Sequence, residues 1–164
     1  MGLASDLFSA VSAAVSSQIS HGKAAEITVD PSSQHGHQGD DTVFVLNQDN
    51  AKFELFRSSN NLTFIYGKND FAGYYGGGEQ TIYDFGTGAH LQFSEITAPI
   101  KVCGFEHDAS AVVDLINAPA GTTLRSDGHG GTMLGNIDFV GATVKTSQVN
   151  FLSSDHSLST GGFV

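Results

Sequence analysis

The chain has 164 residues and carries 17 acidic against 7 basic side chains, so its formal net charge is −10. A surface this acidic repels phosphate backbones and argues against a nucleic-acid partner. Hydrophobic residues make up 40% of the chain, which is enough for one ordinary domain with a buried core and argues against intrinsic disorder. The many carboxylates suit hard cations, calcium above all.

The first thirty residues predict an N-terminal α-helical arm that ends in a short strand. Apolar residues recur at helical spacing over residues 5–20, and a strand is expected over residues 24–29. We expect the helical stripe to pack either on the body of its own domain or on another copy of the chain. Its predicted self-assembly residues are Leu7, Phe8, Val11, Val15 and Ile19.

The same segment bears on export and membrane insertion. Residues 1–20 contain no Lys or Arg, so the positive n-region of a secretory signal peptide is missing. Ser and Asp interrupt the apolar residues, so no membrane span is expected here. If the protein is exported, we expect its targeting signal elsewhere in the chain.

Beyond residue 30 the pattern becomes that of a mainly β protein. Short runs rich in Phe, Ile, Val, Tyr and Thr recur about every ten residues, with Gly-rich or Asn-rich turns between them. This spacing favours a β-solenoid (β-roll-like) fold, with a two-sheet β-sandwich as the alternative. We expect one β-rich domain over residues 31–164, after the arm of residues 1–30. Its predicted strands are 43–46, 53–56, 62–66, 81–85, 89–95, 100–105 and 112–116.

Two Gly-rich segments indicate calcium binding. The segment 36–44 matches the β-roll nonapeptide G-G-x-G-x-D-x-U-x at Gly36, Gly39, Asp41 and Val43, with His37 in place of the second glycine. In such a motif the glycines let backbone carbonyls face a cation, and the Asp adds a carboxylate. A second Gly-rich turn follows Asp127. The predicted calcium ligands are Asp40, Asp41, Asp108 and Asp127.

Residues 81–152 resemble the C-terminal region of repeats-in-toxin (RTX) calcium-binding proteins. The matching stretches occur in the family's order: Ile-Tyr-Asp-Phe (82–85), Leu-Gln-Phe (91–93), Val-Cys-Gly-Phe-Glu-His-Asp (102–108), Val-Val-Asp-Leu (112–115), Asp-Gly-His-Gly-Gly-Thr-Met-Leu (127–134), Ile-Asp-Phe-Val-Gly (137–141) and Ser-Gln-Val (147–149) with Phe151. The resemblance implies export from a Gram-negative bacterium through a type I ABC transporter, with an uncleaved C-terminal signal that includes residues 142–164.

The chain also departs from that family. It has one imperfect nonapeptide instead of a tandem array, and about forty residues before the β region leave no room for an upstream toxin or catalytic domain. We therefore interpret it as the family's tail module used as a whole protein.

The sequence does not contain a recognisable catalytic constellation. Cys103 is the only cysteine and fits a small buried apolar residue. His21, His35 and His37 could approach one ion but lack the further ligands of a zinc centre, which favours a solvated loop. Tyr74 and Tyr75 could stack on a sugar or pack structurally.

We therefore expect a non-enzymatic, secreted or cell-surface, calcium-binding structural protein that self-assembles outside the cell, as a filament, matrix, surface-layer or adhesive subunit. The alternative is a carbohydrate-binding or small-ligand-binding module, or an accessory module of a secreted enzyme. Size-exclusion chromatography or negative-stain imaging would separate a polymer from a monomeric binder.

Overall fold

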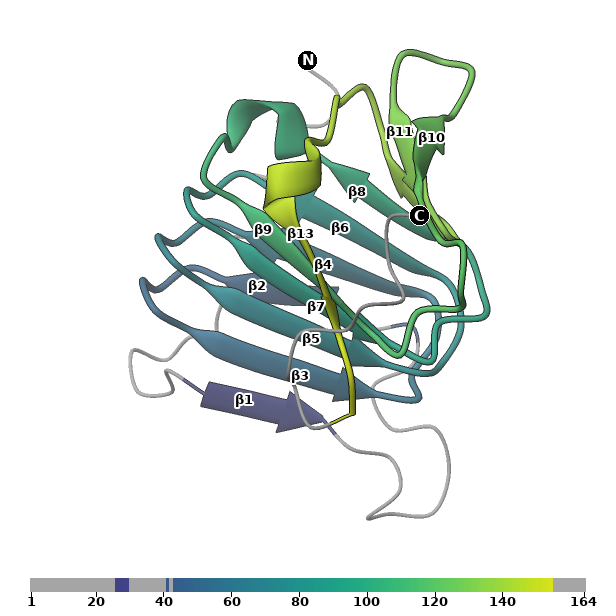
Figure 1. Cartoon of the computed structure of the whole chain (residues 1–164). Helices are drawn as coiled ribbons and strands as arrows, with labels where there is room; N and C mark the ends of the chain where they lie inside the picture. Colours follow the sequence, from purple (N-terminus) through teal and green to yellow (C-terminus); the bar gives the residue numbers. More distant parts are fainter. Residues whose placement is uncertain (1–25, 30–40, 42, 155–164) are drawn as a thin grey trace.

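The computed structural model describes residues 41 and 43–154, together with the backbone of residues 26–29 (Figure 1). The predicted helix over residues 5–20, the predicted ligand Asp40 and most of the nonapeptide-like segment lie outside these residues. The predicted strand before residue 30 is confirmed as β1 (Glu26–Val29).

Two sheets stand face to face and form the body of the protein (Figure 1). Sheet A contains, in spatial order, β1, β3 (Lys52–Phe56), β5 (Phe71–Tyr75), β7 (His90–Ser94), β9 (Val112–Ile116) and β13 (Val149–Leu152). Sheet B contains β10 (Leu124–Ser126), β11 (Thr132–Leu134), β12 (Ile137–Phe139), β8 (Ile100–Cys103), β6 (Gln80–Asp84), β4 (Asn61–Ile65) and β2 (Val43–Leu46).

From β2 to β9 the chain alternates between the two sheets, which makes a parallel β-solenoid of about four turns. Val43, Leu62 and Thr81 pair in register, so the first two turns advance by 19 residues each. Thr81 pairs with Lys101, so the third advances by 20. The predicted solenoid is therefore confirmed. The sandwich alternative is wrong, because sandwich sheets are antiparallel whereas these strands are joined by parallel pairings.

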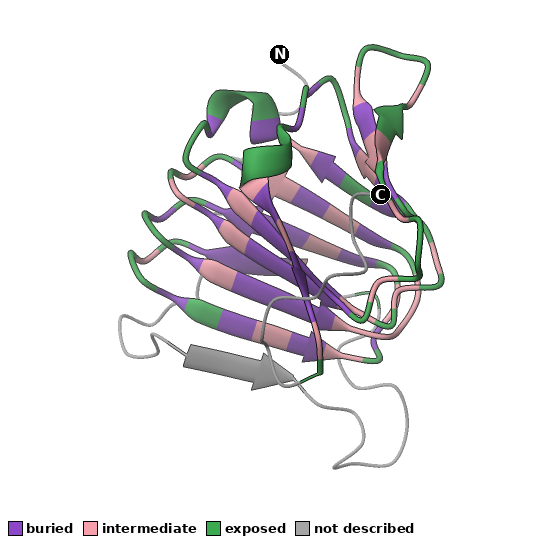
Figure 2. Ribbon diagram, in the orientation of Figure 1, coloured by how far each residue is buried: buried purple, intermediate pink, exposed green. Residues whose placement is uncertain are grey.

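The core lies between the sheets and follows the alternation of side chains along each strand (Figure 2). In β3, for example, Phe53 and Leu55 point inward and are buried, whereas Lys52 is exposed and Glu54 is partly exposed. The aromatic rings of successive turns stack inside, as Tyr74 does on Phe93 with ring centroids 5.6 Å apart. One continuous apolar core therefore joins all turns.

The corners between the sheets repeat a backbone conformation more strictly than a residue type. We call the connections from sheet A to sheet B the A-to-B corners and those from sheet B to sheet A the B-to-A corners. The residue that follows β3, β5, β7 or β9 has φ between 54° and 68°, although it is Arg57, Gly76, Glu95 or Asn117 respectively. Such left-handed positions let the chain turn through a tight corner.

The last part of the chain leaves the regular spiral before it returns. β10, β11 and β12 form an antiparallel meander, and then β12 and β13 pair in parallel with β8 and β9. The predicted strand over residues 100–105 ends earlier, at Cys103, because Gly104 has φ 90° and starts the 3-10 helix Phe105–His107. A second short 3-10 helix, Thr146–Gln148, precedes β13.

Candidate functional site

The structure places the described calcium candidates in three separate parts of the solenoid. Asp41 precedes β2 at an A-to-B corner, where its backbone N–H donates to the Ser59 carbonyl at 3.0 Å. Asp108 lies in a B-to-A corner, and Asp127 lies in the loop between β10 and β11. Within residues 41 and 43–154, no three His, Cys, Asp or Glu side chains form a metal-binding group. Each Asp would therefore belong to a site of its own.

The buried carboxylate of Asp108 fastens one turn of the solenoid to the next. Its two oxygens accept hydrogen bonds from the backbone N–H groups of Gly88 at 2.7 Å and Ala89 at 3.0 Å. Asp70 has the same role two turns earlier, where it accepts from Ala51 at 2.8 Å and Gly67 at 3.1 Å. At the corners, these backbone N–H groups do not donate to a neighbouring strand, and the Asp side chains accept their hydrogen bonds instead. They give Asp108 a structural role.

A third buried carboxyl group, that of Asp84, ends strand β6 and lies next to the same row of corners. One of its oxygens accepts from the Gly86 N–H at 3.0 Å, and its Oδ2 has no hydrogen-bond partner in the described part of the chain. Burial, and then the neighbouring Asp108 carboxylate, raise the pKa of Asp84 to about 9. A carboxyl group with so high a pKa is neutral at pH 7, which lets Asp84 lie beside a second carboxyl group without a counter-ion.

Two carboxyl groups, those of Asp127 and Asp138, lie together where the β10–β11 loop meets β12. The carboxylate of Asp127 accepts from the N–H groups of His129 at 2.6 Å and Gly131 at 2.8 Å, and these bonds lower its pKa. Burial, and then a hydrogen bond to Asp127, raise the pKa of Asp138. The Oδ1 of Asp138 is buried and lacks a hydrogen-bond partner among the described residues.

Backbone geometry brings a further oxygen to the same place. A Cβ atom built on Gly131 would lie 2.3 Å from Asp127 Oδ2 and 2.5 Å from the Phe139 carbonyl oxygen, so both oxygens border the space that this glycine leaves open. Carboxylate and carbonyl oxygens are the ligands that Ca²⁺ prefers. The sequence pattern singled out Asp127 but missed Asp138, which lies in β12 across the meander.

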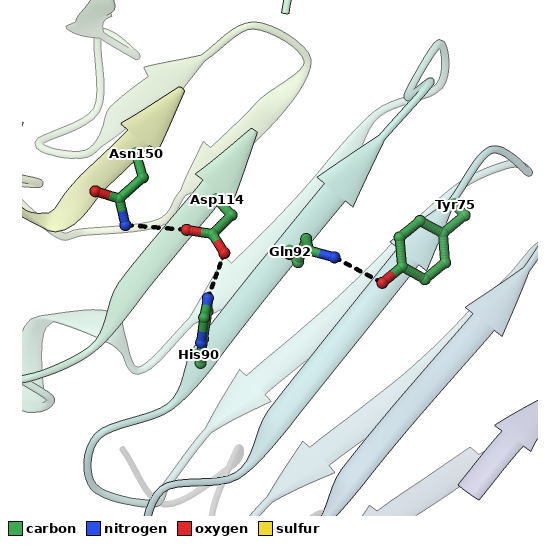
Figure 3. A network of polar contacts seen from close by, with 5 residues as sticks. All are labelled: Tyr75, His90, Gln92, Asp114 and Asn150. Carbon is green, nitrogen blue, oxygen red and sulfur yellow. Dashed lines mark hydrogen bonds and ion pairs between the residues drawn. The ribbon is translucent and has the colours of Figure 1, made fainter. Parts of the chain in front are cut away.

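The outer face of sheet A carries polar contacts that connect four strands (Figure 3). The Asp114 carboxylate contacts His90 Nε2 at 2.5 Å and accepts from the Asn150 amide at 3.0 Å. Beside it, the Gln92 amide donates to the Tyr75 hydroxyl at 2.7 Å. These contacts join β5 to β7, and β7 to β9 and β13, on the side away from the core.

Gly73 makes room for this network. A Cβ atom at Gly73 would lie 2.5 Å from the Tyr75 hydroxyl oxygen, so the ring of Tyr75 occupies the space that a side chain would fill. Tyr75 also stacks on Phe56, with centroids 4.6 Å apart. Burial, and then the charge of Glu54, raise the pKa of Tyr75 to about 12. Of the two tyrosines considered for sugar stacking, Tyr75 lies on the outer face and Tyr74 is in the core.

A cavity of about 360 Å³ opens between the last A-to-B corners and the meander. Its apolar wall includes Ile96, Leu115 and Leu134, and its polar rim includes Glu95 and Asn136. This volume lies at the small end of the range for ligand pockets. Cys103 lies on the outer face of sheet B and is partly exposed, not deeply buried as its apolar surroundings predicted.

In the part of the chain that the structure describes, no helix is long and apolar enough to cross a membrane. Comparison with known protein families gave no matching family model. No curated protein and no solved structure matched the chain either.

Proposed function

We propose that this chain is an extracellular, calcium-binding structural protein that assembles with itself, and that its role is mechanical or adhesive, not catalytic. The observation that carries the proposal is the parallel solenoid with its open sheet ends. In the described part of the chain, the last strand at each end of either sheet pairs with one neighbouring strand only. β1 and β2 form one end, and β13 and β10 form the other. A strand edge offers N–H and C=O groups to another chain.

Because the two ends differ, contact between them would be head-to-tail. Such a contact repeats without closing and produces a filament. The sequence resemblance to RTX tail modules supports the extracellular location and export through a type I ABC transporter.

The edge of β2 allows a sharp test of assembly. The Leu46 carbonyl accepts from Tyr66 at 2.8 Å on the β4 side, so the backbone groups of Val43 and Val45 face the opposite, outer edge. Val43→Pro removes an N–H from this edge at the first residue of the strand, a position where proline is tolerated. We expect this variant to stay folded and to form no filaments in negative-stain images.

The matched control is Val43→Ala, which shortens the same side chain but keeps the N–H group. It should assemble as the parent chain does. If both variants assemble normally, or if the parent chain is monomeric by size-exclusion chromatography at every concentration with calcium present, assembly through this end is refuted.

We propose that calcium binds at Asp127 and Asp138. Six to eight oxygen ligands are usual for this ion, so the two carboxylates would act together with backbone carbonyls and water. A bound cation would neutralise two carboxyl groups that otherwise repel each other when both are ionised. Asp40 and Asp41 stay predicted ligands of a second site at the start of the solenoid.

The cavity beside β9 supports a second candidate function, the binding of a small ligand. Its apolar wall and few rim polar groups are typical of small-molecule sites. A thermal-shift screen with small neutral oligosaccharides, repeated on the variant Leu134→Phe to fill the cavity, distinguishes the two functions. A ligand effect that this substitution removes, in a chain that never polymerises, would favour the binding module.

A further inference from the structure

The cavity beside β9 opens next to a corner that is longer than the two before it. The A-to-B corner after β7 contains five residues, 95–99, whereas the earlier ones, 57–60 and 76–79, contain four each. This extra residue makes the third turn of the solenoid advance by 20 residues instead of 19. The cavity therefore lies where the regular repeat is interrupted.

At the same corner, a hydrogen bond between successive turns is missing. After β5, the N–H of Gly76 donates to the Ser94 carbonyl of the next turn at 2.8 Å. The equivalent donor one turn later is the N–H of Glu95, and its acceptor would be the Ile116 carbonyl, because Ser94 pairs with Ile116. No such bond joins Glu95 to Ile116 in the described part of the chain. Both residues line the cavity, so the separation of the two turns forms part of its wall.

The polar groups at the rim of the cavity favour a ligand that donates hydrogen bonds. Glu95 is exposed and is the one charged side chain among the described lining residues. The Asn136 amide group donates to the Ile96 carbonyl at 3.2 Å. The Asn117 amide group donates to the Ser154 hydroxyl at 2.7 Å. The rim therefore offers a carboxylate and two amide oxygens, which are all acceptors.

The inner wall of the cavity is apolar and suits an aliphatic body. Leu115 and Leu134 are buried, and both line the cavity together with Ile96 and Ala118. Each CH₂ group that moves from water into such surroundings tightens binding about fourfold. An anionic head group would instead meet the Glu95 carboxylate, on a chain whose net charge is −10.

We propose that this cavity binds an apolar primary amine. The alkyl body lies against Leu115 and Leu134, and the ammonium group lies at the rim, where it donates to the Glu95 carboxylate and to the Asn136 amide oxygen. Such an amine is charged at pH 7, since its pKa is close to the value of about 10.4 for lysine. The inference rests on the second candidate function, small-ligand binding in this cavity, and is independent of assembly and of calcium.

The test compares three probes that share one alkyl chain and differ in the head group. Hexylammonium, 1-hexanol and hexanoate are titrated calorimetrically into the full chain at pH 7 and low ionic strength. Hexylammonium should bind about fivefold more tightly than hexanol, and hexanoate should bind most weakly. Propylammonium should bind much more weakly than hexylammonium, because it buries fewer CH₂ groups.

Two matched variants locate the charge that the ammonium group recognises. Glu95→Gln should weaken the binding of hexylammonium about threefold and leave that of hexanol unchanged, an effect of the size expected for an exposed ion pair. Glu79→Gln removes an exposed carboxylate from the preceding A-to-B corner, outside the described lining of the cavity, and should change neither affinity. Equal weakening in both variants would overturn the proposal, because the attraction would then come from the net charge of the chain.

A third variant fills the cavity. Leu134→Phe should abolish the binding of all three probes; if its thermal midpoint shows that it does not fold, Ala118→Phe replaces it. Equal affinities for hexylammonium and hexanol would overturn the assignment of an amine, although the cavity would remain a ligand site. If none of the probes binds, the proposal is overturned as well. An oligosaccharide effect that Leu134→Phe removes would then show that the second candidate function stands without it.

Discussion

Asp84, the last residue of β6, lies beside Asp108 of the next B-to-A corner, and the carboxyl group of Asp84 is neutral at pH 7. Burial and the Asp108 carboxylate raise the pKa of Asp84 to about 9. The side chain of Asp108 accepts hydrogen bonds from two backbone N–H groups of the preceding turn. The raised pKa of this buried carboxyl group makes the stability of the fold dependent on pH.

The first prediction concerns this dependence. The raised pKa means that the folded chain binds the Asp84 proton more tightly than the unfolded chain, where the pKa is about 3.8. The stabilising contribution is therefore complete below about pH 4 and is lost as the pH rises through about 9. Asp84→Asn, which imitates the neutral acid, should raise the thermal midpoint at pH 9 by about 4 °C or more and change it little at pH 4.

The exposed Asp41 supplies the control, because Asp41→Asn removes a carboxylate that no corner buries. Its thermal midpoint should follow the parent chain at every pH. Parallel pH profiles for the parent chain and Asp84→Asn would show that Asp84 is ionised in the fold.

The second prediction concerns calcium. Saturating Ca²⁺ should raise the thermal midpoint by several degrees relative to a chelator, since a ligand at about 100 times its Kd stabilises by about 2.7 kcal/mol. Asp127→Asn and Asp138→Asn should each abolish most of this shift, whereas Asp41→Asn should abolish it only if the nonapeptide-like segment holds the ion. An identical midpoint with calcium and with chelator would remove calcium from the proposal.

The sequence predicts the fold class because turn-forming residues separate the short strands at nearly even spacing. It does not show the 19-residue repeat, because the corners conserve backbone conformation while the residue varies, as at Arg57 and Gly76. The strand β5 was missed, since Phe-Ala-Gly-Tyr-Tyr runs directly into three glycines and resembles a turn. Gly73 in that strand makes room for Tyr75, a contact that no local pattern indicates.

The candidate site was predictable only in part. Asp127 stands out because it starts a Gly-rich turn, but Asp138 belongs to a strand, and its proximity depends on the meander of β10 to β12. Asp70 and Asp84 bond to backbone groups of the corners, and Asp70 reaches back to Ala51 in the preceding turn. Such contacts follow from the stacking of turns, which requires the register to be known.

The third prediction concerns the close approach of successive turns. A Cβ atom on Gly86 would lie 2.2 Å from the backbone carbonyl oxygen of Gly67, so Gly86→Ala forces two turns apart. The substitution should lower the free energy of unfolding by about 3 kcal/mol in urea titrations. Gly73→Ala is the matched comparison, because its obstacle is the mobile end of the Tyr75 side chain; it should cost about 1 kcal/mol. Equal losses would mean that the corner can relax as easily as a side chain.

The fourth prediction tests the export route that the family resemblance implies. Val149 and Phe151 of β13 are buried in the core, so a deletion that starts at residue 142 would disturb the fold as well as any signal. Deleting only residues 155–164 leaves every described strand in place. Cells should then retain the protein, while the purified variant keeps the thermal midpoint of the parent chain, which separates lost export from misfolding. A chain with residues 155–164 in scrambled order serves as a composition-matched control and should also be retained.

In the parent chain, intact-mass analysis of secreted protein should find the N-terminal segment uncleaved, because residues 1–20 contain no basic n-region. Secreted protein that lacks about twenty N-terminal residues would instead indicate an ordinary signal peptide.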